Sequence, residues 1–127
     1  IEANKEVYKN LTQYISIDQD LGDGRKSYTV KVIDFENINN NEFLITNQFK
    51  VAGINQNIVP DIVLFVNGLP LAVIECKSPF ITNPMEAGIN QILRYCNNRR
   101  PEENEGAEKL FYYNQILHIL LLIQGQL

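Results

Sequence analysis

The chain has 127 residues and a mass of 14.6 kDa, which suits one domain with a single hydrophobic core. Its 45% hydrophobic and 20% charged residues are typical of a globular protein, and its longest apolar run, residues 116–123, is too short to cross a bilayer. The net charge of −4 and the pI near 4.9 argue against a domain that holds DNA by its own electrostatics, because such binding rests on Lys and Arg.

The sequence shows no sign of export. No basic, apolar leader opens it, and Cys76 and Cys96 are too few for a disulfide scaffold. We therefore expect a reduced, cytoplasmic setting. Ile1 is not a natural start residue, so we expect residues 1–127 to be one domain of a longer polypeptide.

The N-terminal half predicts a helix followed by two strands. Apolar residues recur at helical spacing across residues 2–15, and a polar segment with an Asp-Gly turn signal follows at 18–26. Residues 27–35 alternate between apolar and polar side chains, which predicts a half-buried strand. After the asparagine-rich loop 36–42, the β-formers of residues 43–51 predict a second strand.

Two further strands are predicted at residues 61–66 and 71–77. Asn67-Gly68 between them is a strong hairpin signal. Both strands are apolar at consecutive positions, so we expect both of their faces to be covered, in the centre of the sheet.

A helix is predicted to begin at Pro84, with Asn83 as its N-cap and Glu86 as the reciprocal capping residue. Its apolar face would comprise Ile89, Ile92, Leu93 and Cys96, and Pro101 prevents it from continuing. The last apolar segment, residues 110–123, is compatible with a strand or a helix. This order of elements predicts a single α/β or α+β domain.

Charged residues occur where the central strands should be apolar. Glu75 and Lys77 follow an apolar run and, being two residues apart on a strand, point to the same face. Desolvated charges must be paired or neutralised, so their position indicates a site. Asp61 joins them if it lies opposite Glu75, which requires an odd loop, such as residues 67–69, or a compensating bulge.

Two carboxylates that converge on one point need a cation between them, and hard oxygen ligands favour Mg²⁺ over zinc. We expect Asp61, Glu75 and the main-chain carbonyl of Cys76 to bind this metal, which would activate water and polarise a phosphoryl oxygen. Lys77 would stabilise negative charge or position the attacking water. This chemistry is phosphodiester hydrolysis. The alternative is an ordinary Glu75–Lys77 ion pair, with Asp61 simply opening a strand.

The pair Pro60-Asp61, thirteen residues and then Glu75-Cys76-Lys77 match the signature of PD-(D/E)xK nucleases. Around this signature, several segments resemble the N-terminal nuclease domain of type I restriction enzyme R subunits: residues 32–37, 41–49, 69–79 and 110–116. The resemblance covers about residues 28–117. It implies a PD-(D/E)xK core with a mixed central sheet flanked by helices, and Mg²⁺-dependent cleavage of double-stranded DNA.

In that family the domain precedes a motor that translocates DNA using ATP, and methylation and specificity subunits supply sequence recognition. The resemblance therefore implies that these other parts bring the DNA to an acidic nuclease domain, and that ATP binds to the motor. It also implies a cytoplasmic protein of a bacterium or archaeon that needs no membrane. Two other functions stay open: another PD-(D/E)xK nuclease of repair or of mobile elements, and a non-catalytic docking domain of the same fold.

The family also resembles RecB-type nucleases, which carry a Gln-x-x-x-Tyr motif on the helix after the catalytic strand. Gln91 and Tyr95 match this motif, and their spacing places both side chains on one helix face. The resemblance implies that they orient the substrate or Lys77. Alternatively, Tyr95 is a core aromatic residue with a satisfied hydroxyl group.

The remaining candidates are less specific. Members of the wider fold often add an acidic residue from the first helix, for which Glu2 and Glu6 are candidates, and the family commonly has arginine where this chain has Val59. Three arginines could contact phosphate, although a solvated face is the simpler interpretation for the last two: Arg94, Arg99 and Arg100. We expect His118, in its apolar run, to be a core histidine. Residues 118–127 match the family poorly.

Overall fold

The computed structural model describes residues 2–122 of the chain. Its elements, in order, are α1 (Glu2–Thr12), β1 (Ile15–Asp20), β2 (Arg25–Val30), the 3-10 turn η1 (Ile38–Asn40), β3 (Phe43–Asn47), β4 (Ile62–Val66), β5 (Leu69–Lys77), α2 (Pro84–Tyr95), the 3-10 turn η2 (Pro101–Glu103), α3 (Glu108–Phe111) and β6 (Ile116–Leu121). Within this described part, no helix is long and apolar enough to span a membrane.

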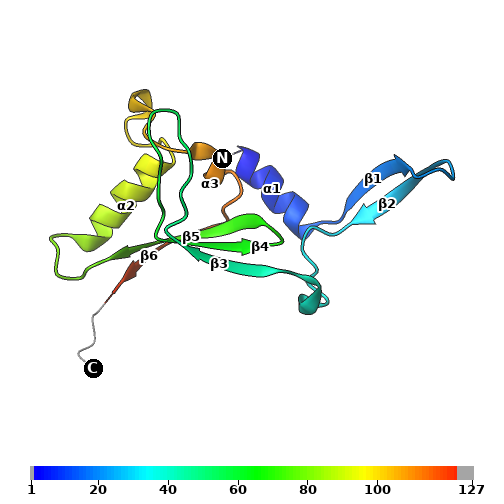
Figure 1. The fold of residues 1–127 in the computed structure, drawn as a ribbon, viewed down its shortest axis with the longest axis horizontal. Coiled ribbons are helices and arrows are strands. Elements are labelled where there is room, and N and C mark those ends of the chain that lie inside the picture. Colours follow the sequence, from blue (N-terminus) through cyan, green and yellow to red (C-terminus); the bar gives the residue numbers. More distant parts are fainter. Residues whose placement is uncertain (1, 123–127) are drawn as a thin grey trace.

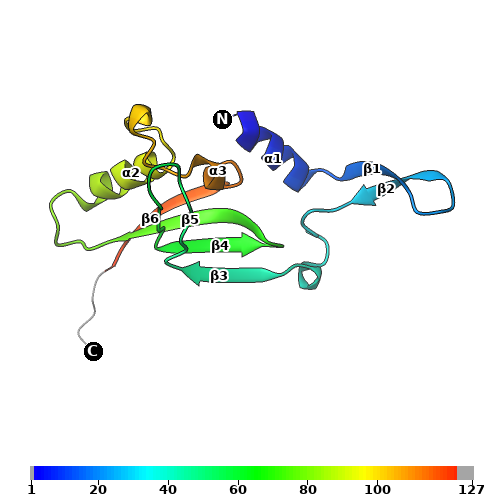
Figure 2. The ribbon, with the colours of Figure 1, turned by 45° about the horizontal axis from the view of Figure 1, so that its top comes forward.

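A four-stranded mixed sheet forms the centre of the molecule, in the order β3-β4-β5-β6. The pairs β3–β4 and β4–β5 are antiparallel, whereas β6 runs parallel to β5. The three α-helices lie on one side of this sheet in both views (Figures 1 and 2). The structure confirms the predicted combination of a mixed sheet with helices, and the central position of β4 and β5.

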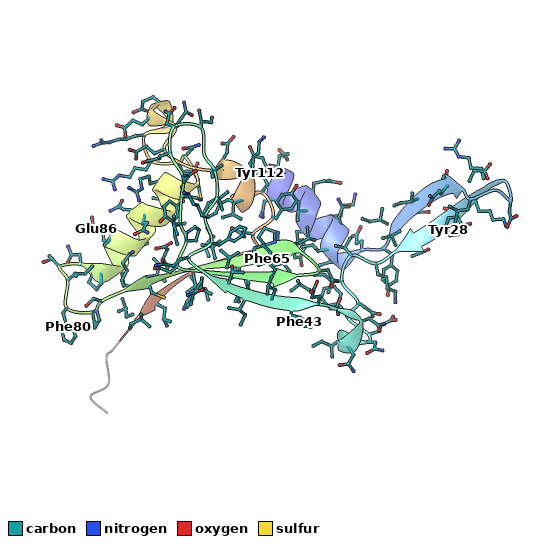
Figure 3. All side chains as sticks on the ribbon, viewed as in Figure 1. Tyr28, Phe43, Phe65, Phe80, Glu86 and Tyr112 are labelled. Atoms are coloured by element: carbon teal, nitrogen blue, oxygen red, sulfur yellow. The ribbon has the colours of Figure 1, made fainter. Side chains whose placement is uncertain are left out.

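The core lies between the sheet and the helices. Val63 and Val73 on the central strands are fully buried there, and the ring of Tyr95 on α2 packs with them. Phe65 joins this core from the helix side of the sheet, whereas Phe43 lies on the opposite side (Figure 3). The expectation that both faces of the central strands are covered is therefore wrong for the described part of the chain: the helices cover only one.

The N-terminal region differs from the prediction. The first helix ends at Thr12, and residues 18–26, expected as a loop, form most of the β1–β2 hairpin, in which Ile15 pairs with Val30 and Ile17 with Tyr28. This hairpin projects away from the sheet (Figure 1), so its polar residues remain in solvent. The strand expected at residues 27–35 ends at Val30.

The third strand is also shorter than predicted. It ends at Asn47 rather than residue 51, and Val51 forms only an isolated bridge with Ile58. The last apolar segment combines the two structures that its composition allowed, because α3 ends at Phe111 and β6 begins at Ile116.

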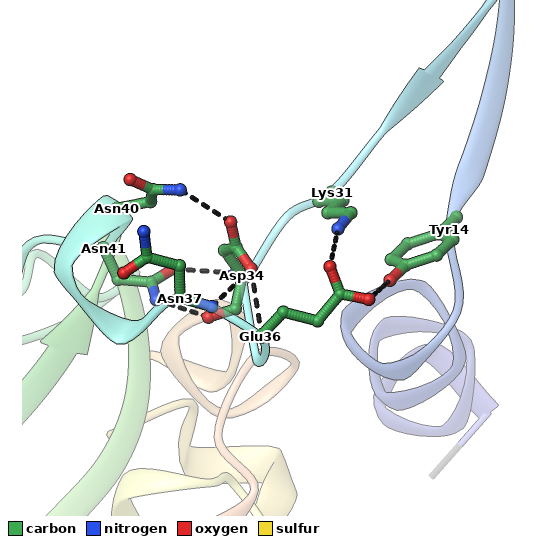
Figure 4. A network of polar contacts seen from close by, with 7 residues as sticks. All are labelled: Tyr14, Lys31, Asp34, Glu36, Asn37, Asn40 and Asn41. Carbon is green, nitrogen blue, oxygen red and sulfur yellow. Dashed lines mark hydrogen bonds and ion pairs between the residues drawn. The ribbon is translucent and has the colours of Figure 1, made fainter.

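A polar network joins the hairpin to the sheet (Figure 4). The Lys31 ammonium lies 2.7 Å from the Glu36 carboxylate, which also accepts a hydrogen bond from the Tyr14 hydroxyl at 3.1 Å. Asp34 accepts the backbone N–H groups of Glu36 and Asn37, both at 3.0 Å. The Asn37 N–H contributes most to lowering the pKa of Asp34. These contacts hold the chain between β2 and β3 in a defined path.

Helix α2 begins at Pro84 as predicted, but its expected capping box is absent. Asn83 has a left-handed conformation, with φ of 51°, and its side chain donates to Glu86 at 3.3 Å instead of capping the helix. Gly88 allows α2 to approach the sheet closely, because a Cβ atom there would lie 2.8 Å from the Ile119 side chain. Of the predicted apolar face, Ile92 is buried, whereas Ile89 remains about half exposed.

Candidate active site

A β-bulge brings Asp61 and Glu75 to the same face of the sheet. The hairpin loop holds an even number of residues, Asn67-Gly68, and the strands start in the register Val66 opposite Leu69. The register then shifts between Leu64 and Phe65, so that Ile62 lies opposite Ile74. Continued by one residue, this register places Asp61 opposite Glu75. Of the two predicted arrangements, the structure has the compensating bulge and not the odd loop.

Backbone groups hold Asp61 at the open end of the β4–β5 hairpin, away from its turn. Its Oδ2 atom accepts the N–H of Cys76 at 2.8 Å, and its own carbonyl accepts the N–H of Gln48, also at 2.8 Å. The side chain is half-buried. One carboxylate oxygen is thus fixed against β5 beside Glu75.

Glu75 is the only charged side chain among the fully buried residues of the described chain. Its Oε2 atom lies 3.4 Å from the ammonium group of Lys77, and its Oε1 atom has no hydrogen-bond partner. Burial, together with the smaller effect of the Asp61 charge, raises the pKa of Glu75 to about 7. An unpaired carboxylate oxygen in such surroundings is costly unless a cation compensates it.

The raised pKa has a consequence for stability. Glu75 protonates more readily in the folded chain than in the unfolded chain, where its pKa is near 4.5. Its stabilising contribution is therefore fully present below about pH 4.5 and is lost as the pH rises through about 7. Near neutral pH, the metal-free fold carries an unfavourable charge at this position.

Lys77, Gln91 and Tyr95 form one chain of hydrogen bonds. The Lys77 ammonium donates to Gln91 Oε1 at 2.5 Å, Gln91 Nε2 donates to the Tyr95 hydroxyl at 2.7 Å, and this hydroxyl donates to the Val59 carbonyl at 3.3 Å. The Tyr95 ring is also buried in the core, and its hydroxyl group is satisfied by these hydrogen bonds. The chain connects the lysine on β5 to the segment that leads into Asp61.

The charges and donors of the site fit a divalent cation. Asp61 and Glu75 together bring two negative charges, and Lys77 compensates one of them. The unpartnered Glu75 Oε1 provides an oxygen ligand that no protein group uses. Mg²⁺ commonly binds to one or two carboxylates and completes its shell with water and substrate phosphates. No group of three or more His, Cys, Asp or Glu side chains within residues 2–122 is placed to hold a metal, so Glu2 and Glu6 do not join this pair.

Other predicted residues take no part in the hydrogen bonds between Lys77, Gln91 and Tyr95. Arg94 stacks over the Tyr95 ring at 5.5 Å, and Arg100 pairs with Glu103 at 3.1 Å. His118 is exposed on β6, so the prediction of a core histidine is wrong, because its side of the sheet is the one that the helices leave uncovered. The part of residues 118–127 that is described continues β6 to Leu121; residues 123–127 lie outside the described residues.

The site also contains two backbone groups that the side-chain pattern did not reveal: the Cys76 N–H and the Val59 carbonyl. A register argument could have identified the first, because Cys76 adjoins the residue opposite Asp61. The sequence contains no signal for the second. Cys76 and Cys96 are both free thiols, and burial raises the pKa of Cys96 to about 12.

Comparisons with a family model and with individual proteins all match type I restriction enzymes. Residues 1–123 match the family described as type I restriction enzyme R protein N terminus. The chain is 36% identical over 116 residues to a putative type I restriction enzyme MjaIXP endonuclease subunit of Methanocaldococcus jannaschii, covering 89% of this chain and 10% of the relative. It is 34% identical over 120 residues to the type I restriction enzyme HindI endonuclease subunit of Haemophilus influenzae, covering 94% and 11%. The chain thus spans about a tenth of the length of these relatives.

Proposed function

Because the chain belongs to the family of type I restriction enzyme R protein N termini, we propose that it is the DNA-cleaving region of such a protein. The proposed reaction is Mg²⁺-dependent hydrolysis of DNA phosphodiesters at a PD-(D/E)xK site. The observation that carries the proposal is the convergence of Asp61 and a buried, partly unpaired Glu75 beside Lys77. A docking domain would have no use for a buried carboxylate that lacks a partner.

The ligands of the proposed Mg²⁺ are the carboxylates of Asp61 and Glu75 and the main-chain carbonyl of Cys76. When bound, the ion supplies Lewis-acid polarisation of the phosphoryl oxygen and lowers the pKa of water at the site. The Cys76 N–H fixes Asp61 Oδ2 at 2.8 Å and so keeps the aspartate beside β5 before any ligand arrives. This preorganisation reduces the cost of assembling the site.

Lys77 carries the positive charge that faces the substrate. An ammonium group has three N–H donors, and in this structure Glu75 and Gln91 accept two of them. The third is available for a phosphate oxygen or for the attacking water. Gln91 and Tyr95 fix the direction of the lysine, so they act as positioning residues.

The proposed partners follow from the acidity of the chain. With a net charge of −4, it relies on other parts to hold double-stranded DNA. In the proposed complex, an ATP-driven motor in the same R protein delivers the DNA, and methylation and specificity subunits supply recognition. We place this complex in the cytoplasm of a bacterium or archaeon.

The proposal is tested in the full-length R protein assembled with its methylation and specificity subunits. DNA cleavage and ATP hydrolysis are measured separately on circular DNA with Mg²⁺. Variants of the site are expected to lose cleavage and to keep ATP hydrolysis. Full cleavage by these variants would instead make this region a docking domain.

Tyr95→Phe is expected to slow DNA cleavage by roughly 10–100-fold, the usual cost of losing a residue that orients a ligand or catalytic group. The phenyl ring keeps the core packing, but the hydrogen bonds to Gln91 and Val59 are lost. The measurement is the cleavage rate at saturating DNA, with Tyr8→Phe on the exposed face of α1 as the control. An unchanged rate would leave Tyr95 with a packing role alone.

Metal affinity is expected to decrease as the pH is lowered, because Glu75 must lose its proton to bind the metal. Its pKa near 7 means that the ionised fraction drops about tenfold between pH 8 and pH 6, and the affinity should drop by the same factor. Mn²⁺ binding to the nucleotide-free full-length protein, followed by electron paramagnetic resonance, measures this change. Glu75→Gln should remove the site, while Glu102→Gln, which is exposed, should not. Equal affinity at both pH values would contradict the role of Glu75.

A further inference from the structure

The sheet face that lies away from the helices is mostly apolar, with Asn47 and His118 as its polar residues. We call it the bare face. Alternate positions of β3 to β6 point to it, and their large apolar side chains include Phe43, Ile45, Leu64, Ile74, Ile116 and Leu120. None of the positions that alternate onto it from these strands is Lys, Arg, Asp or Glu. Ile45 is 72% exposed and Ile116 59%, so the described part of the chain leaves this face open.

The bare face continues into an apolar pocket at the start of β3. Phe43 and Val66 line this pocket together with Phe35 and Ile38 from the loop before β3, and its volume is about 270 Å³. Phe35 is 70% exposed and Ile38 66%. The sheet face and the pocket therefore form one extended apolar surface, of a kind that single domains rarely leave in contact with water.

The strands themselves have the composition of strands that are covered on both faces. Strands β4 and β6 are apolar at almost every position, whereas a strand with one solvated face alternates between apolar and polar residues. Strands β5 and β6 also form a parallel pair, and sheets made only of parallel strands are almost always covered on both faces. The composition of these strands therefore predicts a second covered face, whereas the described part of the chain leaves this face exposed.

We propose that amphipathic helices from the remainder of the R protein pack on the bare face and complete the domain. The chain spans about a tenth of the length of its relatives, so most of an R protein lies outside these 127 residues. Helices are the usual cover for an apolar sheet face. DNA does not fit this surface, because the surface has no Lys or Arg to neutralise phosphates. The inference rests on family membership and not on nuclease activity.

Cysteine labelling of the full-length R protein tests this proposal. Ile45→Cys places a thiol on the bare face, and Ile54→Cys places one in a loop where the native side chain is 78% exposed. A short pulse of a small maleimide, read by mass spectrometry of the peptides that contain the two positions, gives both rates. We expect position 45 to react at least about tenfold more slowly than position 54, with equal rates after denaturation.

Each other outcome overturns the proposal. Equal rates in the native protein would show that the bare face is open to solvent. Protection that disappears on dilution of the isolated R protein would assign the face to a second copy. Protection that arises only when the methylation and specificity subunits are added would assign it to one of them. As a second measurement, Ile45→Asp should lower the melting temperature of the full-length protein more than Ile54→Asp does.

Discussion

Lys77→Ala is expected to reduce DNA cleavage by about 10²–10³-fold or more, the cost typical of removing one donor that stabilises developing negative charge. The substitution removes the ammonium group that lies between Glu75 and Gln91. It also leaves both carboxylates of the site without a compensating protein charge, so the cleavage step loses its positively charged donor. The rate is measured in the assembled complex, on circular DNA with ATP and Mg²⁺.

A second variant tests whether the ammonium group of Lys77 or only its positive charge is needed, and a third variant is the control. Lys77→Arg keeps the charge, but a guanidinium group cannot reproduce the compact geometry of an ammonium group, so only a small part of the activity should return. Lys109→Ala removes an exposed lysine of α3 and should leave cleavage unchanged. ATP hydrolysis should be normal in all three variants. Wild-type cleavage by Lys77→Ala would exclude Lys77 from the active site.

Asp61→Ala is expected to reduce cleavage by roughly 10³-fold or more, which corresponds to about 4 kcal/mol of transition-state stabilisation. The loss has two causes. A proposed metal ligand disappears, and the Cys76 N–H loses the acceptor that lies 2.8 Å away. Because Asp61 also raises the pKa of Glu75, the remaining glutamate should ionise at lower pH in this variant.

The matched control for Asp61→Ala is Asp23→Ala, which removes an exposed aspartate from the turn of the β1–β2 hairpin. It changes the net charge by the same amount and should cleave DNA normally. Asp61→Asn provides a stricter test, because an amide keeps the shape of the side chain and loses its charge. If Asp61→Asn cleaved DNA at the wild-type rate, a metal-binding role for Asp61 would be wrong.

Much of the candidate site could be predicted because charge is costly inside a sheet. Glu75 and Lys77 stand out in an apolar strand, and their two-residue spacing determines that they share a face. The full register could not be predicted in the same way. It depends on a bulge beside Pro70, a residue that has no N–H for the strand ladder, and on the Leu71 carbonyl, which accepts the N–H of Gln115 at 2.7 Å.

The errors in the fold have physical reasons as well. The strand residues within 18–26 are polar on both faces, and a solvent-exposed hairpin imposes no pattern of burial that the sequence would display. Ile15 continues the helical spacing of α1 yet pairs with Val30, so local periodicity alone could not locate the end of the helix. The apolar neighbours of His118 predicted burial, which would hold in a sheet covered on both faces. In the described part of the chain the helices cover only one face, and His118 lies on the other.

Leu71 is the extra residue of the bulge, because Leu64 pairs with Ala72 and Phe65 with Pro70. Whether the site forms therefore depends on whether the number of residues in the hairpin is odd or even. Side chains alternate along a strand, so the number of residues between Asp61 and Glu75, together with the bulge, decides whether the two carboxylates meet or face opposite ways. A single deletion that the bulge does not absorb would turn part of one strand over, which would separate the carboxylates and also move Val63 or Val73 out of the core. A change of two residues in the length of the hairpin would preserve the pairing. A difference of one preserves it only when a bulge is gained or lost.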